Sequence, residues 1–515
     1  MRKPLLILAL FLCQLNLKAQ SRSEFRGVWI ATVDNIDWPT RGNYNTDSQK
    51  AEFIKILDIH QRNGINAVVA QVRPATDAFY PSPYEPWSEW LTGKQGRPPF
   101  PYYDPLQFMI EETHKRGMEF HAWCNPYRAI FQLGKSSIAP THITRIHPEW
   151  FLDYGDKRYF DPGNKEAQDF VVNVIRDIVS RYAVDAIHFD DYFYPYRITG
   201  KEFPDSKSYA QFNNGLSKDD WRRSNVDSII SKLSRAIKEE NKRCQFGISP
   251  FGIWRNQSQD AEGSLTQGGQ TNYDDLYADI LLWLKKDWID YVAPQIYFEF
   301  NHPRAAFEVL LDWWSKHSYG KHCYIGLGPY KSGSNAAWKD KTQIPRQIEA
   351  ILKTENVQGV IYFSSKSLTN NLSGWGDSLR LNYYKEASLP EPMPWLNLDR
   401  PLAPFVANAQ LINSNTVKLS AKLSDAETRK VKSLRVYQSA GDSWQFINHY
   451  TSELIKELPV DQIAAIDISL PASKSNCQFF ITVVEENGIE SLPYRGFPLK
   501  LQYQRKATGE WQVKP

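Results

Sequence analysis

Apolar and polar positions follow two alternating periods along the chain as far as about residue 385. Short runs rich in Val, Ile and aromatic residues, typical of buried strands, precede longer stretches whose apolar residues recur every three or four positions, typical of amphipathic helices. The runs that predict strands are Phe25–Thr32, Ala67–Arg73, Glu119–Asn125, Ala186–Tyr192, Gln245–Pro250, Tyr291–Tyr297, Cys323–Gly328 and Val357–Ser364. Eight strand–helix units close a (β/α)8 TIM barrel. This α/β fold is favoured over a doubly wound open sheet because no glycine-rich phosphate turn follows the first strand.

The predicted helices between these strands begin and end at capping residues. One begins near Asp47 and ends at Gly64, the next begins at Asp104 and ends at Gly117, and a third covers residues 165–182 with one apolar face. An Asp side chain accepts hydrogen bonds from the free N–H groups of a first turn, and Gly adopts the left-handed conformation that ends a helix.

The segments after the first four predicted strands are longer than a barrel needs. These insertions, rich in Trp, Tyr, Pro and Gly, cover residues 33–46, 74–103, 126–163 and 193–223. All of them follow the C-terminal ends of strands, where a barrel keeps its active site. We therefore expect a groove with aromatic walls at that end, which we call the mouth.

A different pattern begins after residue 388. Closely spaced prolines predict a semi-rigid linker over residues 389–404. Short alternating strands then predict a small β-sandwich over residues 405–503, followed by a tail over 504–515. Its predicted strands are Thr416–Leu423, Lys432–Ser439, Trp444–Tyr450, Ala465–Leu470 and Gln478–Glu485, with a turn at Asn487 and Gly488. The stretch FFITVVEENGIESLP resembles the end of a fibronectin type III domain.

Residues 1–19 have the pattern of a secretory signal peptide. Arg2 and Lys3 precede the apolar run Leu5–Leu12, and cleavage is expected after Ala19. The barrel domain would then cover residues 20–388, and the mature protein would be periplasmic or secreted. Cys13 offers lipid attachment as an alternative, which is disfavoured because the residue before it is a bulky leucine.

Composition excludes several classes of protein. The chain has 515 residues, 42% of them hydrophobic, which is enough for more than one domain with a large core. Three of the 61 basic residues fall within residues 1–19, and the remaining 58 balance 58 acidic residues, so nothing favours a nucleic-acid partner. The four cysteines beyond residue 19 match no zinc pattern, and we expect buried thiols, no metal and no cofactor.

Polar residues recur on one side of the predicted barrel strands. Outward side chains pack on helices and must be apolar, so the polar ones point inward. A barrel built for stability alone would carry branched aliphatic residues there. The inward polar or aromatic residues toward the mouth are Gln71, Arg73, His121, Trp123, Asn125, His188, Asp190, Tyr192, Gln295, Tyr297, Glu299, Tyr330 and Ser364.

Three acidic residues at strand ends are the catalytic candidates: Asp190, Asp191 and Glu299. Adjacent carboxylates repel, so one of the two aspartates can stay protonated near neutral pH. A protonated acid beside an ionised one is what glycosidic bond cleavage requires. Strict alternation points Asp190 inward and Asp191 outward, but strand ends twist, so both stay candidates, and Glu299 could act from across the mouth.

Each candidate has a structural alternative. An Asp pair also caps loops, a strand histidine is usually a hydrogen-bonded core residue, and arginines form salt bridges. A metal site of His121, His188 and Asp190 would lack the closely spaced histidine pair of metal hydrolases. A barrel that only binds glycan would have Asp190 alone and Glu299 turned into a salt bridge.

Eight motifs occur in an order that resembles a known family. They are FRGVWIATV, QVRPATDAFYPS, DPLQFMIEETHKRGMEFHAWCNPYR, HPEW, DAIHFDDYFYP, DWRRSNV, FGISPFGIW and VAPQIYFEF. Over roughly residues 24–385 the chain is similar to the bacterial glycosyl-hydrolase-like family ten, relatives of the divisome-associated enzyme that cleaves denuded peptidoglycan. The resemblance implies a TIM barrel, an envelope location, a glycan substrate and envelope or divisome partners. The family often has Trp after PQIY, where this chain has Phe298.

A weaker likeness links DAIHFDDY to the fourth-strand motif of family 18 chitinases, whose acid stands where this chain has Tyr192. The sequence therefore predicts an exported glycoside hydrolase of an N-acetylated glycan, with peptide-free peptidoglycan strands as the expected substrate. The alternatives are a non-catalytic glycan-binding envelope protein and a hydrolase of another polysaccharide. The residues expected to hold the sugar are Arg73, His121, Asn125, Tyr127, Arg128, Tyr192, Trp254, Gln295 and Tyr297.

Overall fold

The computed structural model describes residues 24–385 without a gap. Beyond them it describes residues 388, 390–391, 393–396, 401, 404–423, 431–439, 452–470, 476–485, 490–491, 502–506 and 508–513. These residues form two compact units, divided at residue 401. The predicted signal peptide, the predicted strand Trp444–Tyr450 and the turn at Asn487 and Gly488 lie outside the described residues. Within the described part of the chain, no helix is long and apolar enough to cross a membrane.

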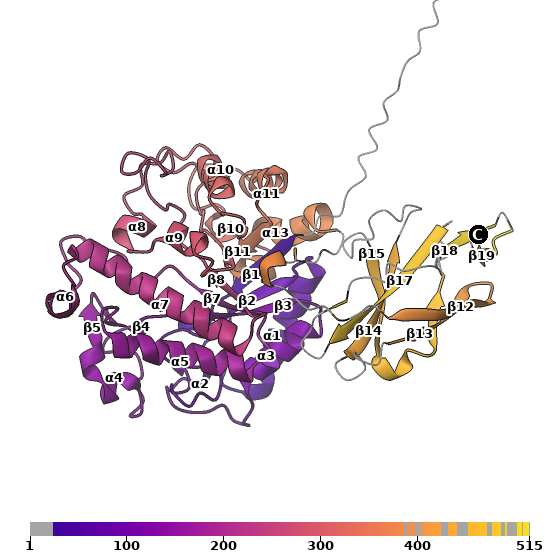
Figure 1. Cartoon of the computed structure of the whole chain (residues 1–515), viewed down its shortest axis with the longest axis horizontal. Coiled ribbons are helices and arrows are strands. Elements are labelled where there is room, and N and C mark those ends of the chain that lie inside the picture. The colour runs from indigo at the N-terminus through magenta and orange to yellow at the C-terminus, as the bar shows by residue number, and fades with distance from the viewer. Residues whose placement is uncertain are drawn as a thin grey trace, which may run out of the picture. The chain divides into compact units, whose positions relative to one another are not determined.

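Eight parallel strands of the first unit close into a barrel (Figure 1), which confirms the predicted fold. Going round the barrel, the order is β1, β11, β10, β9, β8, β7, β3, β2. Their bounds are β1 (Phe25–Ile30), β2 (Ala67–Arg73), β3 (Glu119–Cys124), β7 (Ala186–Phe189), β8 (Gln245–Ile248), β9 (Tyr291–Val292), β10 (His322–Leu327) and β11 (Gly359–Tyr362). Every one of them overlaps a predicted strand.

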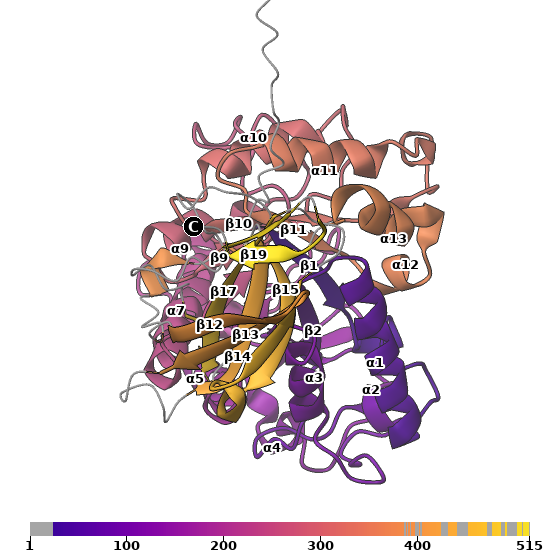
Figure 2. The same cartoon turned by 90° about the vertical axis from the view of Figure 1, so that its right-hand side faces the viewer.

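Helices form an outer layer around these strands (Figures 1 and 2). The helices are α1 (Thr46–Arg62), α3 (Pro105–His114), α5 (Lys165–Arg181), α7 (Lys218–Glu240), α9 (Ile280–Lys285), α10 (Phe307–Lys316), α11 (Gln343–Lys353), α12 (Ser365–Thr369) and α13 (Trp375–Ser378). The first three match the predicted helices. The side chains of Asn45, Asp104 and Asn164 cap them by accepting hydrogen bonds from first-turn N–H groups.

The four insertions extend from the mouth, as predicted. They contain the short helices α2 (Glu89–Thr92), α4 (Ile143–Ile146) and α6 (Ser206–Phe212) and a small antiparallel sheet of β4 (Arg128–Ile130), β6 (Lys157–Phe160) and β5 (Phe151–Tyr154); α8 (Asn272–Asp275) follows β8. The strands β7 and β9 end three and five residues before their predicted ends, at Phe189 and Val292. Asp190, Asp191, Gln295 and Tyr297 consequently lie in loops at the mouth, where strict alternation no longer holds.

Aromatic side chains fill the barrel interior. The rings of Phe25 and Tyr324 stack at 4.0 Å between centroids, and the ring of Tyr291 lies 5.1 Å from that of Tyr324. Gly247 makes room for Tyr291, because a Cβ atom at Gly247 would lie 1.9 Å from the Cζ atom of that ring. Cys124, Cys244 and Cys323 are buried and free.

Residues 393–396 of the predicted linker pack against the end of the barrel opposite the mouth. Met393 and Leu396 join the hydrophobic cluster of the barrel interior. The indole N–H of Trp395 donates to Oδ1 of Asp290, just before β9, at 2.9 Å. This stretch of the linker is therefore part of the barrel unit.

The second unit consists of two antiparallel sheets. One has the order β12 (Phe405–Asn413), β13 (Thr416–Lys422), β16 (Ile466–Ser469), and the other β15 (Ser452–Pro459), β14 (Val431–Ser439), β17 (Asn476–Glu485), β18 (Gln502–Arg505), β19 (Trp511–Val513). Side chains from both sheets, among them Leu419 and Val436, share one core. Four predicted strands are confirmed here.

Candidate active site

Asp190 follows β7 directly, and its buried carboxylate points to β3. The Asn125 side-chain amide donates to both carboxylate oxygens at 3.1 Å, and the Trp123 indole N–H donates to one of them at 3.2 Å. Burial raises the pKa of Asp190, whereas the charge of Arg128 and these hydrogen bonds act to lower it. The donors stabilise the ionised form of this carboxyl group.

Asp191 is also buried, and it lies in the loop that follows β7 at the mouth. The Tyr196 hydroxyl donates to its carboxylate, and the Gln295 side chain, whose amide donates to the Ser249 carbonyl at 2.9 Å, acts with Tyr196 to lower the pKa of Asp191. Burial, followed by the negative charge of Asp190, raises the pKa of Asp191 to about 7. A carboxyl group with this pKa is partly protonated near neutral pH, beside the charge of Asp190 that helps to raise it.

Glu299 lies apart from this pair, in the segment after β9. Its half-buried carboxylate accepts a hydrogen bond from the Trp338 indole N–H at 3.1 Å. Lys331 lies close enough for the two charges to interact, but its ammonium group donates to the Tyr297 carbonyl at 2.6 Å. Among the described residues, Glu299 has neither an ion pair within 4.0 Å nor a hydrogen bond to either aspartate. The salt bridge expected of a purely binding barrel is therefore not formed.

An aromatic wall, which we define as Tyr297, Tyr330, Phe363 and Trp29, stands beside the aspartates. The ring centroid of Tyr297 lies 5.8 Å from that of Tyr330 and 6.1 Å from that of Phe363. Phe363 lies 6.1 Å from Trp29, and Tyr330 is 46% exposed. The charge of Asp191 contributes to raising the pKa of Tyr297, which places this wall near the acid. Apolar ring faces of this kind suit the C–H faces of sugars.

Arg128 and Tyr192 lie close to Asp190. The backbone N–H of Arg128 donates to Oδ1 of Asn125 at 2.8 Å, and its guanidinium donates to the Pro74 carbonyl at 3.0 and 3.1 Å. The guanidinium carbon lies 5.8 Å from the ring centroid of the half-buried Tyr192. The structure thus brings together five of the predicted sugar-binding residues: Asn125, Arg128, Tyr192, Gln295 and Tyr297.

The other four predicted binding residues are buried and have other partners. Arg73 is fully buried in an ion pair with Glu85. The fully buried His121 is on β3, deeper in the barrel, and bonds to Glu119 at the start of that strand at 3.1 Å. Tyr127 and Trp254 are buried in the main core, where Tyr127 packs on Phe160 and Trp254 stacks on Trp313 at 5.9 Å between centroids.

The histidines of the metal alternative have other partners. Nδ1 of His121 and Nδ1 of His188 both share a hydrogen bond with the Tyr291 hydroxyl, at 2.8 and 2.9 Å. In the part of the chain that the structure describes, no group of three or more His, Cys, Asp or Glu side chains is arranged to hold a metal ion.

Two residues of the mouth were not predicted. Tyr196 holds the Asp191 carboxylate, and Asp37 accepts hydrogen bonds at 2.8 Å from the Ser364 hydroxyl and from the backbone N–H groups of Ala31 and Lys366. Burial raises the pKa of Asp37 to about 6. Both residues lie in insertions without a hydrophobic period, so no pattern in the sequence indicated them.

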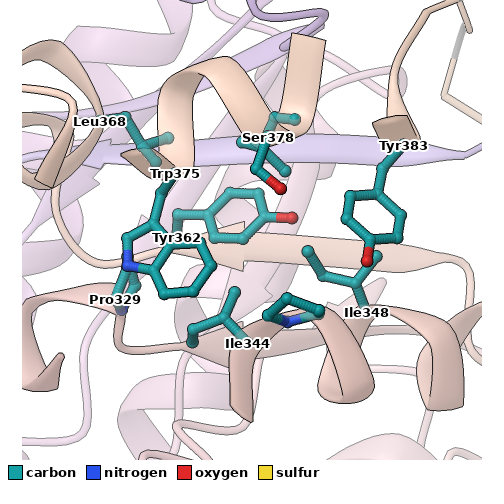
Figure 3. A pocket seen from close by; sticks show the side chains of 10 residues that line it. Pro329, Ile344, Ile348, Tyr362, Leu368, Trp375, Ser378 and Tyr383 are labelled. Atoms are coloured by element: carbon teal, nitrogen blue, oxygen red, sulfur yellow. The ribbon is translucent and has the colours of Figure 1, made fainter. Parts of the chain in front are cut away.

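A separate pocket lies outside the barrel, between β11 and the helices α11 to α13 (Figure 3). Its lining is apolar apart from a few hydroxyl groups, and includes Ile344, Ile348, Trp375 and Tyr383. None of the candidate carboxylates lines it, so the barrel mouth is the candidate active site.

Comparison with known sequences shows the family to which this chain belongs. The model of the Glycosyl hydrolase-like 10 family matches residues 24–343. The protein "Glycosyl hydrolase YngK" of Bacillus subtilis (strain 168) is 44% identical over 431 residues, which cover 82% of this chain and 84% of that protein. "Glycosyl hydrolase DigH" of Escherichia coli (strain K12) is 38% identical over 370 residues, covering 67% and 83%. The chain belongs to the Glycosyl hydrolase-like 10 family, and the predicted enzyme class, a glycoside hydrolase, is confirmed.

Solved structures give more distant matches. The catalytic domain of β-amylase from Paenibacillus polymyxa aligns with a TM-score of 0.45 and 13% identity, covering 72% of this chain and all of that one. The PgaB (BpsB) glycoside hydrolase domain from Bordetella bronchiseptica aligns with a TM-score of 0.41 and 11% identity, covering 70% and 98%.

Proposed function

We propose that this chain is an exported hydrolase that cleaves glycosidic bonds in an N-acetylated glycan, namely peptidoglycan strands without their peptides. The observation that carries the proposal is the buried pair Asp190 and Asp191, which at neutral pH combines a proton donor with a negative charge. The resemblance of the eight motifs to the family supports the choice of substrate, and the pattern of residues 1–19 supports export.

In this proposal Asp191 is the general acid. Its pKa of about 7 lets it hold a proton near neutral pH and pass it to the oxygen of the leaving sugar. The ionised Asp190, held by Asn125 and Trp123, stabilises the positive charge that develops on the sugar ring, either directly or by orienting the N-acetyl group of the substrate.

Glu299 is proposed as the second carboxylate across the mouth. Because no ion pair occupies it, its carboxylate can act as nucleophile or as the base that activates water. The aromatic wall would carry the apolar sugar faces, and Arg128 would face an acidic group of the glycan. We propose that the C-terminal unit, whose two sheets share one core, is a fibronectin type III-like sandwich.

The test is incubation of purified residues 20–515 with amidase-stripped peptidoglycan strands, with the products identified by mass. Fragments that gain one water support hydrolysis, and anhydro ends would contradict it. The variants Asp190→Asn, Asp191→Asn and Glu299→Gln should each lower kcat by about 10²–10⁴-fold. Asp177→Asn, which loses an ion pair with Arg181 within α5, is the matched control.

Two further outcomes distinguish the alternatives. If peptidoglycan strands bind the protein but stay uncut, the protein is a glycan-binding protein and not a hydrolase of these strands. If the protein cleaves chitin, cellulose or another polysaccharide in a parallel panel but leaves peptidoglycan strands uncut, the proposed hydrolase activity stands and the proposed substrate is wrong.

A further inference from the structure

Arg73 and Glu85 form an ion pair beneath the mouth, with both side chains completely buried. Nε of Arg73 donates to the two carboxylate oxygens of Glu85 at 3.0 and 2.9 Å, and Nη2 donates to one of them at 2.5 Å. Arg73 is the last residue of β2, and the pairing of β2 with β3 shifts register between Gln71 and Arg73. Such a bulge re-aims the side chain that follows it, here away from the sugar and toward the insertion.

The remaining donor of Arg73 holds the first residues after β3. Its Nη1 donates to the carbonyl oxygen of Asn125 and, at 3.2 Å, to that of Pro126. The backbone N–H of Asn125 donates back to the Arg73 carbonyl at 2.9 Å. The backbone of Asn125 is therefore fixed on both sides by one arginine.

Asn125 in turn holds two groups of the active site. Its side-chain amide donates to both oxygens of Asp190, and its Oδ1 accepts from the backbone N–H of Arg128. A small movement of the Asn125 backbone would lengthen all three hydrogen bonds. The chain of contacts thus runs from Glu85 through Arg73 and Asn125 to the carboxylate of Asp190.

A buried ion pair of this kind gives little stability beyond what apolar residues of the same size would give, because desolvation offsets the attraction. What an arginine fork adds is direction, since its donors lie in one plane with fixed angles. The pair here directs one donor at the turn that carries Asn125.

We propose that Arg73 and Glu85 are positioning residues of this enzyme, which fix the Asn125 amide against the Asp190 carboxylate without touching the substrate. The inference rests on the proposed role of Asp190. It replaces the sugar contact expected of Arg73 from the sequence and gives Glu85 a role that no motif indicated.

The ionisation of Asp190 reports on this positioning. The charged and titratable groups that act on it are Arg128 from β4, Asp191, Tyr192 and Tyr196 from the loop after β7, and Cys124 from β3. Of these groups, Cys124 is the one on which the charge of Arg73 acts, and burial raises the pKa of its thiol, so it stays neutral whichever residue stands at position 73. A shift in the titration of Asp190 would therefore come from the hydrogen bonds of Asn125.

The experiment compares Arg73→Lys with the wild-type protein in the pH profile of kcat/KM on amidase-stripped strands. Lysine keeps the charge but has one nitrogen in place of the planar fork, so it cannot hold Glu85 and the Asn125 carbonyl in the same geometry. We expect the acidic limb, set by ionised Asp190, to move up by about one pH unit. The double variant Arg73→Met with Glu85→Leu removes the pair without leaving a buried charge, should fold, and should show the same shift.

The matched control is Arg222→Lys, which makes the same change in the buried ion pair of Arg222 with Asp205. An equal shift in this control, or an unchanged acidic limb in either folded Arg73 variant, would overturn the proposal. If the wild-type protein cleaves no glycan, the proposed function fails, and infrared titration of the carboxyl band that Asp190→Asn removes still measures the shift.

Discussion

The indole N–H of Trp29 donates to Nε2 of His188 at 3.2 Å inside the barrel. A neutral histidine that accepts at Nε2 carries its proton on Nδ1, so His188 donates to the Tyr291 hydroxyl. That hydroxyl then donates to Nδ1 of His121, and His121 donates from Nε2 to Glu119. The hydrogen bond from Trp29 therefore sets the direction of each further hydrogen bond in this series, from His188 to Glu119.

Tyr291→Phe should destabilise the fold, because it leaves a ring nitrogen on each of two buried histidines without its partner. We expect the free energy of unfolding to fall by about 2–4 kcal/mol, measured by urea denaturation at neutral pH. Tyr362→Phe is the control, since the buried Tyr362 hydroxyl has a single hydroxyl partner, Tyr384, and should cost less. Equal losses of unfolding free energy in the two variants would show that the hydrogen bonds to the two histidines add no more stability than a single hydroxyl pair.

Tyr196→Phe should move the alkaline limb of the activity profile upward. The Tyr196 hydroxyl donates to Asp191 and lowers its pKa, so its removal should raise that pKa above about 7 and keep the acid protonated to higher pH. The shift, about one pH unit, is read from kcat/KM between pH 5 and pH 9. Tyr209→Phe, whose hydroxyl bonds an exposed loop carbonyl, should leave the limb in place.

Asp191→Asn should stabilise the protein in alkaline solution while it removes activity. The folded pKa of about 7 lies above the ordinary value of 3.8, so the folded state binds a proton that the unfolded state has lost. Wild-type stability therefore falls as pH rises from about 4 through 7. The variant does not undergo this loss, so its free energy of unfolding should exceed that of the wild-type protein by up to about 4 kcal/mol at pH 8 and by little below pH 4. Urea denaturation at both pH values checks this, and a variant that is no more stable at pH 8 would contradict it.

Tyr330→Ala should weaken substrate binding without affecting stability. Tyr330 is 46% exposed at the edge of the aromatic wall, and loss of one ring face on a sugar should raise KM for long strands by about tenfold. Tyr102→Ala, at a 64% exposed tyrosine of the second insertion, is the control and should leave KM unchanged. Equal KM values for the two variants would remove Tyr330 from the proposed binding surface.

Periodicity predicted most of the barrel because each strand must hide one side from water. The same rule located Asp190 and Asn125, whose inward positions follow from alternation with apolar neighbours. At the end of β2 a bulge interrupts this alternation, and the Arg73 side chain is buried in an ion pair with Glu85. For Asp191 alternation left the direction open, because β7 stops at Phe189 and the residues that follow form a loop.

Residues in the insertions were beyond this kind of prediction. Asp37, Glu85 and Tyr196 lie in segments with no repeating hydrophobic pattern, and each gains its role from a partner far away in sequence or around a tight loop. Ser364, for example, meets Asp37 across 327 positions of the chain. Only the folded chain shows such pairs.

The contact between Trp395 and Asp290 determines where this enzyme can be shortened. The family match ends at residue 343, before β11, and a cut at residue 388 would keep all eight strands but discard Met393, Trp395 and Leu396. Such a fragment would expose the apolar side chains at the end of the barrel opposite the mouth to water and would be prone to aggregate. A catalytic fragment that folds by itself therefore has to extend through residue 396, so that its C-terminal residues cover the end of the barrel opposite the mouth.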